Sequence, residues 1–201
     1  MTLRGLALTA IFAFVAALLS ALQAQALNIV AIGASNTSGL GVGAQNAYPA
    51  LLEALLRKKG IDAHVTNAGQ SGDVTAGMRN RLDAAVPKGT DIVILQPGAN
   101  DLRFFGSKEA RSANVEAMKQ RLRARGIRVI VYDPDPVPRD FYQWDGIHFN
   151  AAAHAKIAAT LAAQITATIK PTLEKPMPEK PAPEKPTPAA QTAAPPPASK
   201  P

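Results

Sequence analysis

The chain has 201 residues, of which 47% are hydrophobic and none is cysteine. A chain of this length can form one hydrophobic core, which argues against several domains. Because there is no cysteine, disulfides cannot contribute to its stability. The formal net charge is +7, but the basic residues are spread without interleaved aromatic side chains, so we expect no nucleic-acid partner. We interpret them as solvated helix faces, with a mild attraction to anionic envelope surfaces as the alternative.

The N-terminal segment has the layout of a secretory signal. Arg4 precedes an uncharged run at residues 5–22, and Ala24, Gln25 and Ala26 follow as a small-residue cleavage site. We therefore expect residues 1–26 to be a cleaved signal peptide and the protein to be exported, either to the periplasm or out of the cell. A retained anchor is the alternative, because the run approaches the roughly 18 residues that span a bilayer.

Short β-branched runs and segments with helical spacing alternate along the rest of the chain. The β-branched runs predict buried strands at 28–32, 63–66, 91–95 and 127–132. The helical spacing predicts helices at 48–59, 74–82, 112–125 and 151–169. Gly60 ends the first of these helices, and Asn150 stands at the N-cap position of the last.

This alternation predicts an α/β domain over residues 27–170. We expect a three-layer α/β/α sandwich around a mostly parallel, flavodoxin-like sheet of four to five strands. In such a sheet the loops that follow the carboxyl ends of the strands build the functional site. These loops lie at 33–43, 67–75, 96–105 and 133–148.

The last segment, residues 171–201, changes abruptly to Pro, Ala, Glu and Lys. Glu-Lys-Pro recurs from Glu174, Glu179 and Glu184. Because proline removes backbone donors and fixes φ, we expect a disordered tail that is partly polyproline II. A contact with the cell envelope or with a partner is the functional alternative.

The strand-end loops carry the residue types that ester hydrolysis needs. Ser35 follows the first strand, and its hydroxyl requires a nearby base, which His148 supplies from the loop before the last helix. Asp145 stands three residues before His148, close enough to orient the imidazole. Backbone N–H groups at Ser35 and Gly72, with the Asn100 side-chain amide, are candidate donors to the negative charge of a tetrahedral intermediate.

These loops resemble the four sequence blocks of the SGNH (GDSL-type) hydrolase family over residues 28–168. The strings at 67–73 and 145–148 carry the specific part of the likeness, which is nearest to bacterial lysophospholipase, thioesterase and arylesterase members. The resemblance implies Ser35 as nucleophile, Asp145 and His148 as acid and base, and Ser35, Gly72 and Asn100 as the oxyanion hole.

By this resemblance the chain is an exported serine esterase that hydrolyses acyl esters or thioesters through an acyl-enzyme. We expect a small acyl-ester substrate, such as a lipid or an acetylated glycan. We expect neither a cofactor nor a metal, and we expect a monomer.

The sequence departs from the family in two places. Ala34 replaces an Asp that usually helps to hold the nucleophile loop, so we expect a less rigid loop. The stretch between Tyr132 and Asp145 is short and holds only a Pro-rich link at 133–138, whereas relatives have a further helix and strand in this place. We therefore expect a small sheet. The segment at 104–109 is also brief and leaves little material for a lid, so we expect an open, shallow cleft. A catalytically weak or inactive binding module of the envelope is the alternative function.

Other polar residues near these loops are predicted to be structural. His64 in a strand and His154 on the last helix have no matched catalytic partners. Asp73 and Asp101 flank the site, and we expect them to shape its loops rather than to react.

Overall fold

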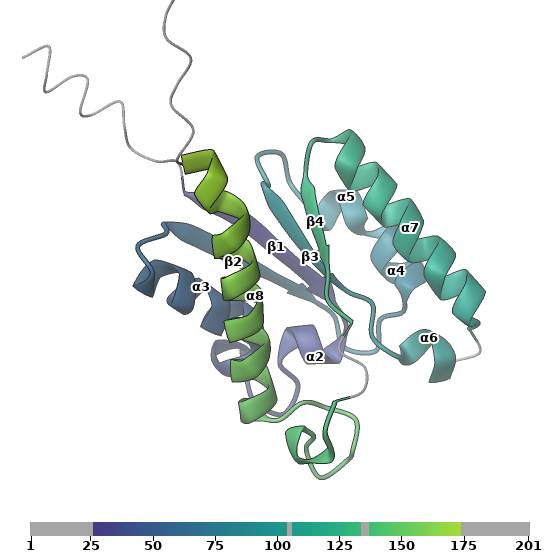
Figure 1. Ribbon diagram of the computed structural model, residues 1–201. Coiled ribbons are helices and arrows are strands. Elements are labelled where there is room, and N and C mark those ends of the chain that lie inside the picture. Colours follow the sequence, from purple (N-terminus) through teal and green to yellow (C-terminus); the bar gives the residue numbers. More distant parts are fainter. Residues whose placement is uncertain (1–25, 104–105, 134–136, 174–201) are drawn as a thin grey trace, which may run out of the picture.

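The structure is a computed structural model that describes residues 26–103, 106–133 and 137–173. A parallel sheet in the order β2-β1-β3-β4 forms its centre (Figure 1). The strands are β1 (Leu27–Gly33), β2 (Ala63–Gly69), β3 (Ile92–Gln96) and β4 (Arg128–Val131). The predicted fold class is confirmed, with four strands in the described part of the chain.

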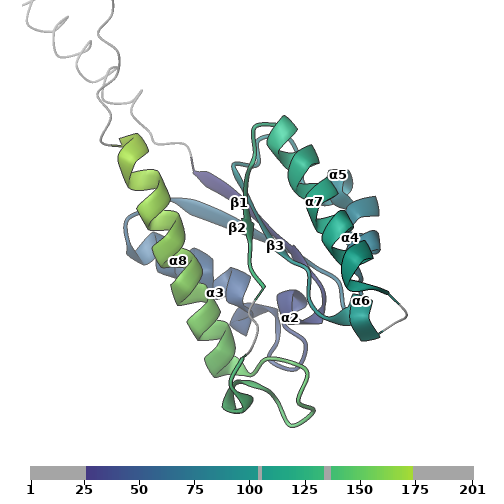
Figure 2. The ribbon, with the colours of Figure 1, turned by 45° about the vertical axis from the view of Figure 1, so that its right-hand side comes forward.

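Helices cover both faces of the sheet, as Figures 1 and 2 show from two directions. One face carries α3 (Tyr48–Lys58) and α8 (Ala151–Leu173), and the other carries α4 (Thr75–Asn80), α5 (Leu82–Ala85) and α7 (Lys108–Ala124). The short helices α2 (Ser35–Ser38) and α6 (Asn100–Arg103) follow the carboxyl ends of β1 and β3, and 3-10 turns span Ala44–Asn46 and Arg139–Phe141.

The central strand β1 is apolar on both sides because both sides are covered. Ile29 and Ala31 pack in the core beneath α3 and α8, whereas Val30 and Ile32 pack with α4, α5 and α7. Successive side chains of a strand point to opposite faces, so a doubly covered strand has no polar face. This explains the continuous apolar run from which the strand was predicted.

Several helix boundaries differ from the sequence prediction. Helix α7 begins at Lys108 rather than near 112, because the Ser107 hydroxyl caps it by accepting from the N–H of Ala110 at 3.1 Å. The predicted helix at 74–82 is divided at Arg81 into α4 and α5. Helix α8 continues to Leu173, and Asn150 caps its start as predicted by accepting from the N–H of Ala153 at 3.1 Å.

The predicted signal peptide at 1–26 lies almost entirely outside the described residues, as does the tail from residue 174 onward. Within the described ranges, no helix combines the length and the apolar character needed to cross a membrane.

His154 is a buried structural residue, as predicted. Its side chain is fully buried, and its Nδ1 accepts a hydrogen bond from the N–H of Tyr48 at 3.2 Å. Its Nε2 has no hydrogen-bond partner among the described residues. Because burial disfavours the charged imidazolium, the pKa of His154 falls to about 4.

This shift makes the folding stability depend on pH. The unfolded chain, with the ordinary pKa near 6.5, binds more protons than the folded chain between pH 6.5 and about 4. The stability that comes from keeping His154 neutral is complete above pH 6.5. As the pH falls below that value, the free energy of unfolding decreases by up to about 3 kcal/mol. Urea unfolding of wild type and His154→Gln should show a steeper loss below pH 6.5 in the wild type. If the free energy of unfolding depended on pH equally in the two proteins, the lowered pKa of His154 would be contradicted.

Candidate active site

The site begins at the turn that carries Ser35, directly after β1. Gly33 ends that strand opposite Gly69 of β2 and Gln96 of β3, so three strand ends meet there. A Cβ at Gly33 would overlap the Thr37 side chain and lie 3.0 Å from the backbone oxygen of Gln96. Glycine at this position therefore allows α2 to fold back onto the end of the sheet.

The turn is fixed without a carboxylate at position 34. The buried Thr37 hydroxyl donates to Oε1 of Gln96 at 2.6 Å and lies 3.2 Å from the Tyr48 hydroxyl. The backbone N–H of Ser38 also donates to the carbonyl of Ala34 at 3.0 Å. Buried hydrogen bonds to β3 and α3 therefore hold the turn, and the expectation of a less rigid loop stays a prediction.

Ser35, His148 and Asp145 form a continuous chain of hydrogen bonds. His148 Nε2 lies 3.1 Å from Ser35 Oγ although the two residues are 113 positions apart, and His148 Nδ1 lies 2.6 Å from Asp145 Oδ2. The side chains of His148 and Asp145 are only 20% and 23% exposed. The three residues predicted to act together are thus in contact at the carboxyl edge of the sheet.

The Asp145 carboxylate is fixed by its own loop. Its Oδ1 accepts from the backbone N–H groups of His148 and Ile147 at 2.9 and 2.8 Å. These bonds, led by the one from the His148 backbone and joined by the His148 side chain, lower the pKa of Asp145 to about 2. The carboxylate is therefore ionised at neutral pH and favours the Nδ1–H tautomer of His148.

Asn36 connects the two halves of the site and was not singled out from the sequence. Its Oδ1 accepts from the backbone N–H of Phe149 at 2.8 Å, and the two residues are 113 positions apart. This bond fastens the turn of Ser35 to the residue that follows His148. The only signal in the sequence was the adjacency of an amide side chain to Ser35, which does not show what it binds.

The two further candidate donors occupy different positions. Asn100 lines the same cleft as Ser35, and its Nδ2 donates to the carbonyl of Asp73 at 2.8 Å, which leaves one amide hydrogen for a ligand. Gly72 is exposed and is not part of the cleft lining, but its neighbour Ser71 lies 3.1 Å from Ser38 of α2, Oγ to Oγ.

Gly72 adopts a backbone conformation that favours glycine. Its φ is +81°, a region that other residues rarely adopt, whereas a Cβ there would meet nothing within 4 Å. Glycine at this position therefore suits the geometry of the turn.

The flanking acids hold the loops, as predicted. Asp73 pairs with Arg81 at 2.8 Å, and Arg81 also donates to the carbonyls of Ala68 and Gly33 at 2.8 and 3.1 Å. Asp101 is buried and accepts from the N–H of Thr75 at 3.0 Å. Arg81 was interpreted as a solvated residue, but its side chain is only 17% exposed because it joins the ends of β1 and β2.

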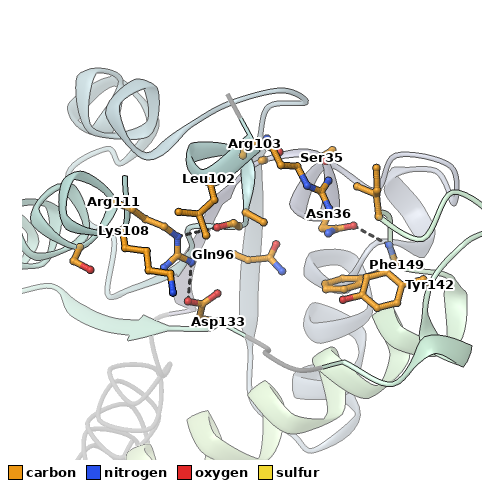
Figure 3. Close-up of a pocket in the computed structure, with 16 residues that line it drawn as sticks. Ser35, Asn36, Gln96, Leu102, Arg103, Lys108, Arg111, Asp133, Tyr142 and Phe149 are labelled. Carbon is orange, nitrogen blue, oxygen red and sulfur yellow. Dashed lines mark hydrogen bonds and ion pairs between the residues drawn. The ribbon is translucent and has the colours of Figure 1, made fainter. Parts of the chain in front are cut away.

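The cleft beside Ser35 has a volume of about 360 Å³ (Figure 3). Ser35, Asn36 and Asn100 line it together with Gln96, whose Oε1 is already bonded to Thr37. Basic side chains from α6 and α7 line it as well: Arg103, Lys108 and Arg111. Arg111 was interpreted as part of a solvated helix face, but its side chain is only 19% exposed.

Comparison with known proteins identifies the family of the chain. The model of the GDSL-like lipase/acylhydrolase family matches residues 31–189. Esterase TesA of Pseudomonas aeruginosa is 31% identical over 142 residues, which cover 68% of this chain and 70% of TesA. An arylesterase of Vibrio mimicus is 31% identical over 115 residues, 56% of this chain and 57% of the arylesterase. A crystal structure of TesA covers 72% of this chain and 98% of its own, with 25% identity and a TM-score of 0.59.

The link through Asn36 predicts an effect on the reactivity of Ser35. Asn36→Ala removes the acceptor for Phe149 and should slow labelling of Ser35 by a fluorophosphonate about threefold to tenfold, because the imidazole is less firmly placed. Asn36→Asp keeps an acceptor oxygen, so the labelling rate should fall less than in Asn36→Ala. The exposed Asn80 provides the control, Asn80→Ala, which should label at the wild-type rate. An Asn36→Ala protein that labels as fast as Asn80→Ala would refute the positioning role.

Proposed function

This chain belongs to the GDSL-like lipase/acylhydrolase family and is a serine hydrolase that acts on esters, and we propose that Ser35, His148 and Asp145 are its catalytic triad. The observation that carries the proposal is the unbroken path from Ser35 Oγ through the imidazole of His148 to the carboxylate of Asp145. The rival function, an inactive binding module, offers no reason for such an alignment.

The proposed chemistry begins with a proton transfer. With Nδ1–H donating to Asp145, the lone pair of His148 Nε2 faces the Ser35 hydroxyl and takes its proton as the oxygen attacks the acyl carbon. The ionised Asp145 stabilises the imidazolium that results. His148 then gives the proton to the leaving alcohol or thiol, and the acyl group remains on Ser35. Water, activated by the same imidazole, releases the acid and restores the hydroxyl.

The tetrahedral intermediate carries its negative charge on the former carbonyl oxygen. We assign its stabilisation to the backbone N–H groups of Ser35 and Gly72 and to the free amide hydrogen of Asn100. The bond from Asn100 to the carbonyl of Asp73 supports this assignment, because it fixes the amide before substrate arrives. A donor fixed in advance need not reorganise during the reaction.

The family and its esterase members establish ester hydrolysis, and we extend the proposal to thioesters because the same attack and the same oxyanion apply. We also propose that the enzyme is exported, on the basis of the signal pattern at residues 1–26. The names of the relatives, an esterase and an arylesterase, support short or aromatic esters as first assay substrates.

The first test removes the nucleophile. Ser35→Ala should abolish hydrolysis of p-nitrophenyl butyrate, because no other hydroxyl is hydrogen-bonded to His148 in the described part of the chain. Ser112 lines the same cleft, so Ser112→Ala serves as the control and should keep activity within about twofold. Hydrolysis that survives Ser35→Ala would overturn the assignment of the nucleophile.

The second test addresses the oxyanion hole. Asn100→Ala should lower kcat by about 10² to 10³ with a small change in KM, because the donor acts mainly in the transition state. Steady-state kinetics on the same ester provide the measurement. A rise in KM at constant kcat would place Asn100 in ground-state binding instead.

A further inference from the structure

We propose that the cleft selects esters whose alcohol part carries a phosphate or carboxylate, and that Lys108, Arg103 and Arg111 bind this anion. The inference rests on the proposed function, since it assigns a substrate class to the site of Ser35. All three basic side chains line the same cleft as Ser35, whereas Asp133 is the one carboxylate among the lining residues.

The three basic side chains differ in the hydrogen bonds and ion pairs that they already form. Arg111 donates through Nε to the carbonyl of Gly98 at 2.9 Å and pairs with Asp133 at 2.7 Å. Arg111 therefore fixes the loop that leads to Asn100, and part of its charge is already neutralised. Lys108 and Arg103 are exposed and form no ion pair with any residue that the structure describes. Their charges are the ones available to a ligand.

The position of Lys108 has a cost that an anionic ligand would offset. Lys108 is the first residue of α7, where the partial positive charge of the helix end disfavours a cation. It also lines the same cleft as Arg103 and Arg111, so like charges face a common space. A bound phosphate or carboxylate relieves this repulsion and can accept hydrogen bonds from ammonium and guanidinium groups.

Part of the lining of the cleft is apolar. Tyr142, Ile147 and Phe149 belong to it, and Figure 3 shows Tyr142 and Phe149 across the cleft from Lys108 and Arg111. Ile147 remains 38% exposed beside the loop of Asp145. An ester with an apolar acyl group and an anionic alcohol matches this mixed lining, with its carbonyl carbon at Ser35. A neutral acetylated sugar would leave the charged part of the lining without a partner.

The experiment compares matched esters that differ in the anion. Monobutyrylglycerol and its 3-phosphate form a soluble pair, and the corresponding monopalmitoyl compounds form an amphiphilic pair. Lys108→Gln and Arg103→Gln should each lower kcat/KM for the phosphate esters roughly threefold to tenfold and leave the neutral esters within about twofold. The control is Lys88→Gln, which makes the same charge change on an exposed turn before β3. It should leave kcat/KM unchanged for both the phosphate esters and the neutral esters.

Salt provides a second readout in the wild-type enzyme. Raising the ionic strength from 0.01 M to 1 M shortens the Debye length from about 30 Å to about 3 Å, so the preference for the phosphate ester should shrink. If Lys108→Gln affects both chain lengths, a soluble organic phosphate is sufficient for recognition; if it affects only the palmitoyl pair, a lipid headgroup is the ligand. A phosphate-to-neutral ratio that neither substitution changes overturns the proposal.

A binding measurement separates this inference from the proposed function. Calorimetric titration of Ser35→Ala with monobutyrylglycerol 3-phosphate needs no catalysis, and Lys108→Gln in that background should weaken Kd by a similar roughly threefold to tenfold factor. If neutral esters are hydrolysed but Kd does not change, the anion site is refuted and the esterase assignment stands. If Ser35→Ala still hydrolyses esters while Kd responds to Lys108→Gln, the nucleophile assignment fails and the anion site stands.

Discussion

The hydrogen bond between Ser35 Oγ and His148 Nε2, 3.1 Å long, is the contact on which the whole account depends. It joins two loops 113 positions apart, and it exists because parallel strands bring their carboxyl ends to one edge of the sheet. Asp145 sets the tautomer of the imidazole, and Asn36 ties the residue after His148 to the turn of Ser35. The bonds of Asp145 and Asn36 help to keep this contact aligned.

The turn of Ser35 is held by hydrogen bonds that need no carboxylate at position 34. With Ala34 in place of an acidic residue, the fold relies on Thr37, which bonds to Gln96 at the end of β3 in a buried environment. Arg81 draws together the ends of β1 and β2 by donating to Gly33 and Ala68. Buried and fully satisfied hydrogen bonds of this kind rigidify the segment that they join.

Much of the fold could be predicted because it is encoded locally. The apolar run of β1 and the helix that Gly60 ends are visible in short windows of sequence. The start of α7 at Lys108 was missed because it depends on one hydroxyl, that of Ser107. The resemblance to the family supplied the triad, whereas the roles of Asn36 and Arg81 could not be inferred, since their partners are distant in sequence and are determined by tertiary packing.

A crystal structure of the enzyme after reaction with diethyl p-nitrophenyl phosphate tests the central claim most directly. We expect one covalent adduct, in which Ser35 Oγ is bonded to phosphorus. A phosphoryl oxygen should lie within hydrogen-bond distance of the N–H groups of Ser35 and Gly72 and of Asn100 Nδ2. An adduct on any other residue would contradict the account. So would a phosphoryl oxygen directed away from these donors.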